Sequence, residues 1–501
     1  MKKLLARIYE IEQGQNQVVL SEKDAQEMSL EVFDRVCLRA NGNMINAMVG
    51  HSESFVKPGE VLLFYEAAKN LKAYPGQEVS IEPAPKPAAI EYIRNKLDGK
   101  TLSNSQIQEI VGDLMTEKLS TAELSAFVCA VQIRGLSPHE ISSLTNAIFK
   151  SGNQLSWKGA KVASMHSIGG VAGDRSTMVV VPIIASLGIL IPKTVTRAIS
   201  SASGTADAME VLAPVSLTTP QIRKVVEKTG GCIAWGGAVD LAVADDKLIK
   251  IRNPLRLDPE GLVVSSILAK KKAEGVKHVL IDVPLGRGAK VEDMEKARFL
   301  AQNFKNIGGH LDLDIHCIIS DGATPLIRTI GPALEARTVI ETLRGKGSQA
   351  LAEKACIIAG MLVSMVDGVS EEKGIEIAKR QLKSGKALKK MREIIGAQGG
   401  DPEVKVEEIE IGTVTKSFYA AEECTVSHVD NRNLAMISRA LGAPANKKAG
   451  VILACGRGEK LKRGQELFKL VTTDKAKLDF AECRLDSFPL VQMKQIILEK
   501  I

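Results

Sequence analysis

The spacing of apolar residues divides the chain into segments with different periods. In the first 80 or so residues, short apolar runs at about 4–12, 17–20, 31–40 and 43–49 alternate with turns, which is typical of β-strands. The tripeptide Asn41-Gly42-Asn43 favours a hairpin, and a short helix is expected from Ser21 onward. Residues 1–85 are therefore predicted to form a β-rich, barrel-like domain.

A proline-rich segment, EPAPKPAA at 82–89, predicts a stiff linker after this domain. From 88 to 152 the apolar residues recur at the three-to-four spacing of helices. Three capping boxes mark helix starts here: Ser103 with Gln106, Ser120 with Glu123, and Ser137 with Glu140. We expect a small helical bundle, to which the helical stretch 247–275 returns, so that the bundle domain comprises 88–152 and 245–275.

After residue 160 the pattern changes to short apolar or β-rich runs separated by helices and glycine turns, which is typical of an α/β domain. The runs include TMVVVPIIASLG at 177–188, and an amphipathic helix is expected over 290–309. A second break, AQGGDP at 397–402, precedes glycine-turned strands. The sequence thus predicts a multi-domain α/β protein with an α/β phosphate-binding domain (158–240 and 278–400) and a C-terminal α+β domain (403–501).

Composition and charge exclude several classes of protein. With 45% hydrophobic and 25% charged residues the chain resembles ordinary globular proteins. The net charge is +7 and no basic run is interleaved with aromatic residues, so we expect small anionic substrates and no nucleic-acid partner. The apolar run 178–192 is too short for a membrane span and the N-terminus lacks signal-peptide features. We therefore expect a cytoplasmic protein with no membrane partner.

The eight cysteines lie mostly in apolar segments and none forms a C-x-x-C motif, which predicts reduced thiols instead of disulfides or a zinc site. No group of His, Cys, Asp and Glu has metal-ligand spacing, so no metal is expected. The segment TTDKAK at 472–477 resembles a lipoyl-lysine hairpin with Lys475 at its tip. We expect that similarity to be one of fold, without modification of the lysine.

The candidate chemistry begins at MHSIGGVAGDRST (165–177), where Gly169, Gly170 and Gly173 lie between a histidine and an aspartate-arginine pair. A glycine-rich loop between a strand and a helix exposes backbone N–H groups that can bind an anion. The lysine of a G-x-x-x-x-G-K-[ST] phosphate loop is missing, however. A tight turn that needs glycine for steric reasons alone is the alternative.

Three further stretches strengthen the case for an anion site. In TVTRAISSASGTADAMEVL (194–212), hydroxyl residues and a glycine surround Arg197, although a polar loop with Ser203 or Thr205 as helix N-cap is an alternative. Ser266 and Lys270 share one face of a predicted helix. Lys290 ends the glycine turn PLGRGAK (284–290). A solvated helix face and an ordinary turn are the alternatives for these last two.

The blocks HSIGGVAGD, TRAISSASGTADAMEVL and SSILAKKKAEG are similar, in order and separation, to three signature blocks of the thymidine and pyrimidine-nucleoside phosphorylase family. The resemblance runs from about residue 88 to 490. It implies a helical domain, a larger α/β domain, a C-terminal domain of the nucleoside phosphorylase II type, and a homodimer or larger homo-oligomer. Anthranilate phosphoribosyltransferase shares the fold and the glycine-rich loop but would not explain the C-terminal domain.

The chain departs from the usual pattern of that family in two ways, and in both it resembles one archaeal branch. That branch uses phosphate to cleave nucleoside 5′-monophosphates into free base and ribose 1,5-bisphosphate. An N-terminal domain precedes the bundle, and TRAISSASGTAD replaces a glycine- and histidine-rich version of the block. The resemblance implies a pentosyltransferase that acts on AMP, and also on CMP and UMP, with inorganic phosphate as co-substrate and no cofactor. The alternatives are a thymidine or pyrimidine nucleoside phosphorylase and a non-catalytic nucleotide-binding module.

The resemblance also implies which residues form the site. Asp258 would be the proton donor to the leaving base. The implied nucleotide-binding residues are Gly170, Thr196, Arg197, Ala198, Ile199, Ser200, Ser201, Thr205, Ser266 and Lys290. The implied phosphate-binding residues are His166, Ser167, Thr177, Thr205 and Lys270. Many relatives carry lysine immediately before the histidine, where this chain has Met165. Either Arg175 or Arg197 then supplies the missing cation, or the affinity for phosphate is lower.

Overall fold

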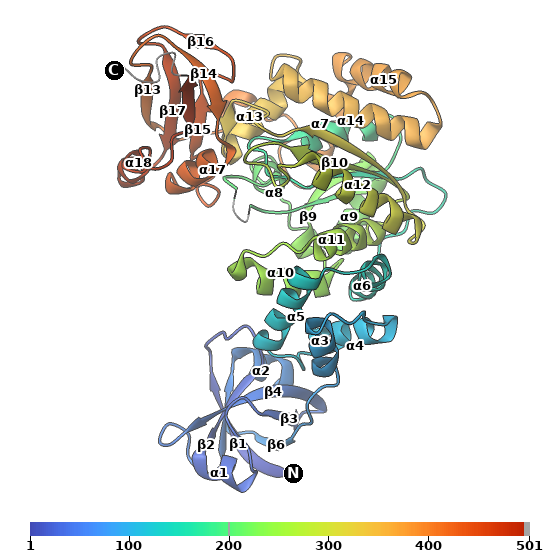
Figure 1. The fold of residues 1–501 in the computed structure, drawn as a ribbon, viewed down its shortest axis with the longest axis vertical. Coiled ribbons are helices and arrows are strands. Elements are labelled where there is room, and N and C mark those ends of the chain that lie inside the picture. Colours follow the sequence, from blue (N-terminus) through green and yellow to red (C-terminus); the bar gives the residue numbers. More distant parts are fainter. Residues whose placement is uncertain (199–200, 495–501) are drawn as a thin grey trace. The chain divides into compact units, whose positions relative to one another are not determined.

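The computed structural model describes residues 1–198 and 201–494, which Figure 1 shows as a ribbon. The chain forms two compact units, Met1–Gly152 with Ala242–Ala269, and Asn153–Leu241 with Lys270–Ile501. Helix α11 (Glu260–Ala273) runs from the first unit into the second. The four domains expected from the sequence are a finer division than these two units, and their boundaries stay a prediction.

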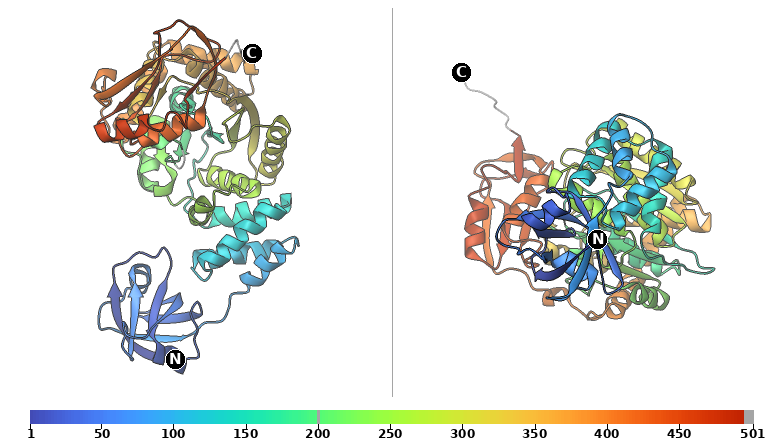
Figure 2. Two further views of the ribbon diagram at one scale, coloured as in Figure 1. Left: turned by 60° about the vertical axis from the view of Figure 1, so that its left-hand side comes forward. Right: turned by 90° about the horizontal axis from the view of Figure 1, so that it is seen from below.

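The first unit begins with a closed β-barrel, drawn in blue in Figure 2. Its strand order is β1-β5-β2-β4-β3-β6. The strands are β1 (Lys2–Tyr9), β2 (Gln17–Ser21), β3 (Arg35–Ala40), β4 (Asn43–Ser52), β5 (Glu60–Phe64) and β6 (Glu78–Pro83). The hairpin is confirmed, because Ala40 pairs with Asn43 while Asn41 and Gly42 have φ values of 51° and 72°. Two helices accompany the barrel, α1 (Glu22–Glu27), capped by Ser21 as expected, and α2 (Tyr65–Leu71).

The remainder of the first unit is helical, and all three capping boxes are confirmed. Each serine hydroxyl accepts a hydrogen bond from the backbone N–H three residues later, so each helix starts where the sequence places it. The helices are α3 (Ala89–Leu97), α4 (Asn104–Met115), α5 (Thr121–Arg134), α6 (Pro138–Lys150), α10 (Val243–Leu255) and the first part of α11. Their apolar faces share one core, to which Phe127, Leu144 and Leu248 belong.

The second unit contains a parallel sheet with the order β11-β10-β7 and a parallel pair β8-β9. The strands are β7 (Ala163–Ser167), β8 (Ile191–Val195), β9 (Gly231–Trp235), β10 (His278–Leu285) and β11 (Asp314–Asp321). A single parallel bridge between Val162 and Leu190 joins β7 to β8. The helices around these strands are α7 (Ser176–Ala185), α8 (Thr205–Met209), α9 (Thr219–Thr229), α12 (Met294–Gly309), α13 (Pro332–Leu343), α14 (Gln349–Asp367), α15 (Glu371–Lys383) and α16 (Lys386–Ala397).

Helix α7 is the central helix of this unit, although its sequence reads as a β-rich or apolar run. All ten of its residues are buried. A fully buried element shows no polar side, so its periodicity cannot separate helix from strand, and packing overrides the strand preference of Val and Ile. The core around it includes Met165, Ile191 and the apolar side of α14.

Helix α14 is the one helix in the described part of the chain that is long and apolar enough to cross a membrane. Its residues Leu351, Ala355, Ala359 and Leu362 are fully buried against α7 in the core of the second unit. The apolar length of α14 is thus explained by the two-sided packing of a central core helix.

The C-terminal part of the second unit has two antiparallel sheets, ordered β12-β15-β17-β13 and β16-β14-β18. The strands are β12 (Thr329–Ile330), β13 (Val414–Tyr419), β14 (Cys424–Val429), β15 (Gly450–Leu453), β16 (Lys460–Leu461), β17 (Glu466–Thr472) and β18 (Val491–Lys494), and the helices are α17 (Asn431–Ala440) and α18 (Lys475–Glu482).

Two predicted element positions are wrong. Lys475 is the first residue of α18, capped by Asp474, and does not lie at the tip of a lipoyl-type hairpin. The helix expected over 290–309 begins at Met294, because Asp293 caps it by accepting a 2.8 Å hydrogen bond from the Lys296 N–H. Lys290 therefore lies in the loop between β10 and α12.

Candidate active site

The glycine-rich loop connects the end of β7 to the start of α7. Its three glycines have positive φ values, which residues with a side chain rarely adopt: +85° at Gly169, +96° at Gly170 and +69° at Gly173. A Cβ on Gly170 would lie 2.4 Å from the backbone nitrogen of Lys290, whereas a Cβ on Gly169 would meet open space. Gly170 thus allows the β10–α12 loop to approach, which brings two of the predicted nucleotide-binding residues, Gly170 and Lys290, together.

The end of this loop is fixed by a buried group of charges. Asp174 accepts hydrogen bonds from the N–H and hydroxyl of Ser176, and Lys354 contacts both Asp174 and Asp282 at 2.8 Å. Burial alone would raise the pKa of Asp174, but the Lys354 ammonium and the Ser176 donors lower it. Burial raises the pKa of Asp282. The first turn of α7 is therefore tied to β10 and α14 through Lys354.

Arg175 joins the glycine loop to the second predicted loop, residues 196–205. Its Nη2 donates to the carbonyl of Ser203 at 2.6 Å, and its Nη1 lies 3.4 Å from the Thr205 hydroxyl. Its Nε pairs with the buried Glu335 at 2.6 Å. Arg175 is thus held in place and neutralised by a carboxylate, and does not supply an uncompensated cation.

The 196–205 loop is folded around Asp207. One carboxylate oxygen of Asp207 accepts from the N–H groups of Ala198 (2.7 Å) and Gly204 (2.9 Å). The N-cap of α8 is Gly204, whose N–H donates to Asp207, so the alternative in which Ser203 or Thr205 is the N-cap is wrong. A Cβ on Gly204 would lie 2.6 Å from the Thr196 carbonyl oxygen, so the loop closes on itself there.

Arg197 forms an ion pair with Glu210, which the sequence analysis did not predict. Its two terminal nitrogens bind Glu210 at 2.6 and 2.5 Å, and its guanidinium lies 4.7 Å from the Trp235 ring centre. The hydrogen bond from Arg197 and the nearby Lys447 lower the pKa of Glu210 to about 2, in spite of partial burial. Arg197 therefore also carries a carboxylate partner.

The remaining predicted residues of this loop differ in how the structure places them. Ser201 donates from its hydroxyl to the Ser203 carbonyl at 3.1 Å. Thr196 is the residue whose carbonyl oxygen accepts from the Ala206 N–H at 3.3 Å. Ile199 and Ser200 lie outside the described residues.

Four lysines impose a positive field on His166 at the end of β7. Burial lowers the pKa of His166 well below its usual 6.5, and the charges of Lys193, Lys271, Lys270 and Lys290 lower it further. Beside it, the Ser167 hydroxyl accepts a weak 3.4 Å hydrogen bond from the Gly169 N–H. A neutral imidazole and a hydroxyl thus lie in a strongly cationic environment, which favours an anionic ligand.

Thr177 and Met165 contact each other below the glycine loop. The Thr177 hydroxyl lies 3.7 Å from the Met165 sulfur, and both residues are buried, Met165 completely. Met165 is a member of the core cluster around α7. The Met165 thioether thus fills core volume and offers no charge to an anion at this position.

Asp258 and Ser266 belong to the first unit. Asp258 lies between α10 and α11, and its carboxylate pairs with the Arg252 guanidinium at 3.2 Å. Ser266, on α11, donates from its hydroxyl to Asp245 at 2.6 Å inside the helical core. Lys270 follows Ser266 by one turn on the same helix, as predicted.

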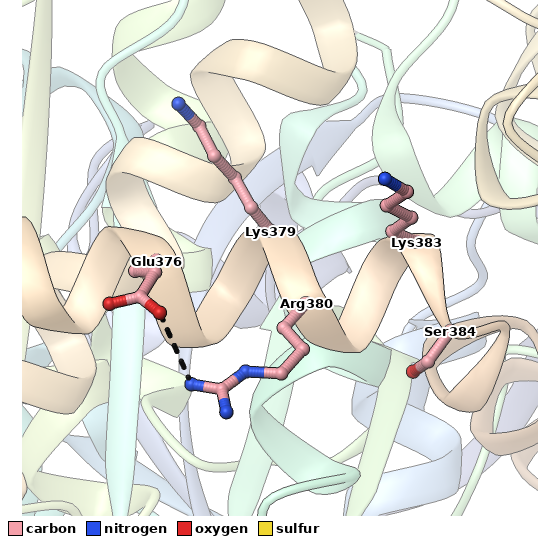
Figure 3. A pocket seen from close by; sticks show the side chains of 5 residues that line it. All are labelled: Glu376, Lys379, Arg380, Lys383 and Ser384. Carbon is pink, nitrogen blue, oxygen red and sulfur yellow. Dashed lines mark ion pairs between the residues drawn. The ribbon is translucent and has the colours of Figure 1, made fainter.

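A surface hollow beside α15 lies outside the two loops, and the described residues hold no metal-ligating cluster. Figure 3 shows a surface hollow of about 390 Å³ beside α15, lined by Glu376, Lys379, Arg380, Lys383 and Ser384. Its one ion pair, Arg380 with Glu376 at 3.7 Å, is well exposed, and none of the predicted site residues lines it. No group of three or more metal-ligating side chains occurs in residues 1–198 and 201–494. All eight cysteines are free thiols.

Sequence reasoning missed the buried and half-buried charged residues around the two loops: Asp174, Lys193, Glu210, Lys271, Glu274, Asp282, Glu335 and Lys354. A usable signal existed for two of them. Lys193 in ILIPKTV is a single charge inside an apolar run, and Lys354 in AEKACIIAG is the only cation of its run, beside Glu353; a charged residue is costly to bury without a role. The partners of Lys354, Asp174 and Asp282, lie far away in the sequence and carry no comparable signal.

Comparison with known proteins agrees with this architecture. Residues 90–152 match the helical bundle domain of the glycosyl transferase family, and residues 159–388 match its a/b domain. The anthranilate phosphoribosyltransferase of Thermus thermophilus superposes with a TM-score of 0.52 over 61% of this chain and 98% of its own, at 18% identity, which shows the fold alone. These matches define the class, a glycosyl transferase with a helical bundle and an α/β domain.

Full-length relatives narrow the class further. The AMP phosphorylase of Thermofilum pendens is 42% identical over 504 residues, which covers 100% of this chain and 98% of the relative. The AMP phosphorylase of Pyrococcus furiosus is 40% identical over 498 residues, with 99% and 98% covered. The chain belongs to the AMP phosphorylase family, and the predicted family resemblance is confirmed.

Proposed function

We propose that this chain catalyses the phosphorolysis of AMP to adenine and ribose 1,5-bisphosphate. The observation that carries the proposal is the 40–42% identity to AMP phosphorylases over nearly the whole of both chains, N-terminal barrel included. The cationic environment at the end of β7 and the glycine loop supports it, because both substrates carry phosphate.

In this reaction an oxygen of inorganic phosphate forms a bond to C1′ of the ribose while the bond from C1′ to the base nitrogen breaks. The electron pair of the broken bond goes to the base, which takes up a proton. Positive charge develops on the ribose, as in other glycosyl transfers. We assign the proton to Asp258 as general acid, and the positions around Gly170, Lys290 and the 196–205 loop to the nucleotide.

The geometry of the loops supports these assignments in one respect. Gly170 and Lys290 are in contact, and Arg175 holds the 196–205 loop against the glycine loop. Backbone N–H groups and a lysine at the carboxyl end of parallel strands form the kind of site that binds phosphate groups in α/β proteins. His166, Ser167, Thr177 and Lys270 are proposed for the inorganic phosphate, which serves as co-substrate with no cofactor.

We further propose that CMP and UMP are accepted, that the protein works in the cytoplasm, and that it forms a homodimer or a larger homo-oligomer. The acceptance of pyrimidine nucleotides follows from the resemblance to pyrimidine-nucleoside phosphorylases in the three sequence blocks. The eight free thiols support a reducing compartment.

The test compares AMP with adenosine at saturating phosphate and measures the release of adenine by chromatography. We expect a higher kcat/KM for AMP, because Lys290 and the loops would bind the 5′-phosphate. A higher value for adenosine would favour a nucleoside phosphorylase and contradict the proposal.

Replacement of the proton donor separates an enzyme from a binding module. Asp258→Asn is expected to lower kcat by about 10²–10⁴-fold, the usual contribution of general acid catalysis. The matched control is Asp98→Asn, an exposed carboxylate at the end of α3 in the same unit, which should leave kcat unchanged. Turnover that is absent in wild type and in both variants would indicate a non-catalytic nucleotide-binding module.

A further inference from the structure

Lys193 is a buried charge that the predicted site residues do not include. It lies in the middle of β8, where all five residues are buried, and 3% of its surface is exposed. Its ammonium donates to the Thr194 carbonyl at 2.5 Å. Since an ammonium has three donors, a single backbone acceptor leaves most of its hydrogen-bonding capacity unused.

Four other cations near the two loops have carboxylate partners. Arg175 pairs with Glu335, Arg197 with Glu210, and Lys354 with Asp174 and Asp282. Lys271 lies 2.7 Å from both oxygens of Glu274. For Lys193, in contrast, no carboxylate among residues 1–198 and 201–494 lies within ion-pair distance.

The surroundings of Lys193 therefore carry an excess of positive charge. The carboxylate with the largest effect on Lys193 is the buried Glu274, which is already paired with Lys271 and accepts hydrogen bonds from Ser164 and Thr194. Burial lowers the pKa of Lys193 well below its usual value, and the neighbouring Lys271 lowers it further, while Glu274 raises it. An uncompensated cation in the interior is costly, and the arrival of an anion would relieve that cost.

The place of Lys193 in the sheet decides where such an anion would lie. β7 and β8 are parallel and meet at the Val162–Leu190 bridge. Three residues further along, the two strands reach Met165 and Lys193, at the same level. The strands then end at Ser167 and Val195, from which the glycine loop and the 196–205 loop start. Ligands of α/β sheets bind at this carboxyl end of the strands.

The charge of Lys193 reaches the start of the glycine loop. Among the charged groups that act on His166, Lys193 has the largest effect. His166 is followed by Ser167 and, after Ile168, by Gly169, where an added Cβ would meet open space. The positive charge of Lys193 therefore acts at the start of the glycine loop, where backbone N–H groups and the Ser167 hydroxyl can bind an anion.

We infer that Lys193 supplies the positive charge that binds the reacting inorganic phosphate, from the strand next to the one that carries Met165. The inference rests on the proposed function, which provides the phosphate co-substrate. This role of Lys193 explains how the chain can have a methionine at position 165. The positive charge comes instead from Lys193, which lies on β8 at the same level as Met165 on β7. The 5′-phosphate of AMP has the same chemistry, so the experiment has to separate the two.

The test measures KM for phosphate and KM for AMP in Lys193→Met and Lys193→Gln. We expect KM for phosphate to rise by about 10- to 100-fold, the effect of losing one charged hydrogen-bond donor, while KM for AMP changes less than about threefold. The matched control is Lys161→Met, an exposed lysine of the same unit that pairs with Asp367 and should leave both values unchanged. An unchanged KM for phosphate, or a rise confined to KM for AMP, would overturn the inference.

An exchange of the two side chains provides a rescue. In the double variant Met165→Lys/Lys193→Met the ammonium moves to the neighbouring strand at the same level. We expect it to recover at least about tenfold of the phosphate affinity lost in Lys193→Met, since the charge is restored beside the same loop. Failure of the folded double variant to recover any affinity contradicts the inference.

Direct binding distinguishes a failure of this inference from a failure of the proposed function. Phosphate without AMP should raise the midpoint of thermal unfolding of the wild-type protein, and the Lys193 variants should lose most of that shift. The loss of the shift in a protein that does not turn over AMP would support the phosphate site and reject AMP phosphorolysis. A phosphate shift equal in wild type, Lys193→Met and Lys193→Gln rejects the role of Lys193, whatever the activity.

Discussion

The Nη2 atom of Arg175 donates a 2.6 Å hydrogen bond to the carbonyl oxygen of Ser203, and this contact joins the glycine loop to the 196–205 loop. Arg175 is itself held by Glu335, and both side chains are more than nine-tenths buried. One guanidinium therefore determines the relative position of two loops that are far apart in the sequence.

The first prediction concerns this guanidinium. Arg175→Ala leaves Glu335 as an unpaired buried carboxylate, so we expect the free energy of unfolding to fall by about 3–5 kcal/mol. The control is Arg94→Ala, which removes an exposed pair with Glu91 and should change stability by no more than about 0.5 kcal/mol. Denaturant titration measures both. Equal, small changes in the two variants would show that Arg175 does not join the loops.

A second prediction separates two adjacent glycines. Both Gly169→Ala and Gly170→Ala introduce strain at positive φ, but only the Cβ at position 170 would collide with the backbone of Ala289 and Lys290. We expect Gly170→Ala to lower kcat/KM for AMP by about 10²-fold, because it displaces the Lys290 loop. Gly169→Ala should cause a clearly smaller loss. Steady-state kinetics of the two variants decide the matter, and a similar loss in both would contradict the close approach.

The third prediction follows from the lowered pKa of His166. In the unfolded chain this histidine takes up a proton near pH 6.5, whereas in the folded protein burial and the four lysines hold its pKa well below that value. The unfolded state therefore binds more protons below pH 6.5, and the folded state loses stability as the pH falls through that range. Above pH 6.5 the residue makes no such contribution.

Substitution of His166 by Asn should remove this part of the pH dependence. The measurement is the midpoint of thermal unfolding of wild type and variant between pH 8 and pH 5. We expect the two curves to run in parallel above pH 6.5 and the wild type to fall more steeply below it. Identical slopes in both proteins at all pH values would show that His166 titrates normally.

A fourth prediction uses the contact between Arg197 and Trp235. The chain has two tryptophans, so Trp157→Phe leaves Trp235 as the sole indole fluorophore. Because the Arg197 guanidinium lies 4.7 Å from the Trp235 ring, binding of AMP at the 196–205 loop should change the emission of Trp235. The change should saturate near the KM for AMP, with a weaker response to adenosine. Emission that saturating AMP leaves unchanged would argue against nucleotide binding at this loop.

Local sequence signals predicted much of the fold. The three capping boxes, the Asn-Gly hairpin and the Ser21 cap are decided by residues within four positions of one another, so the sequence contains all the information that they need. The α7 helix was ambiguous, because a run buried on all sides has no polar period. The helix expected from residue 290 begins at Met294, because the side chain of Asp293 caps it.

The sequence predicted the two loops of the candidate site, but it did not predict how their charged side chains are paired. The glycines and hydroxyls predict an anion site from local composition alone, and that site stays a prediction. The neutralisation of Arg175 by Glu335 joins residues 160 positions apart, and that of Arg197 by Glu210 crosses to the next helix. Lys193 stands alone in an apolar strand, and its excess charge became evident only when the carboxylates around it could be located.

The most direct test of the account is phosphorus NMR of the purified protein incubated with AMP, with and without inorganic phosphate. Phosphorolysis predicts that the inorganic phosphate and AMP signals decline together and that ribose 1,5-bisphosphate, with two phosphate resonances, appears in step with free adenine. Release of adenine without phosphate, with ribose 5-phosphate as the product, would contradict phosphorolysis as the function of this chain.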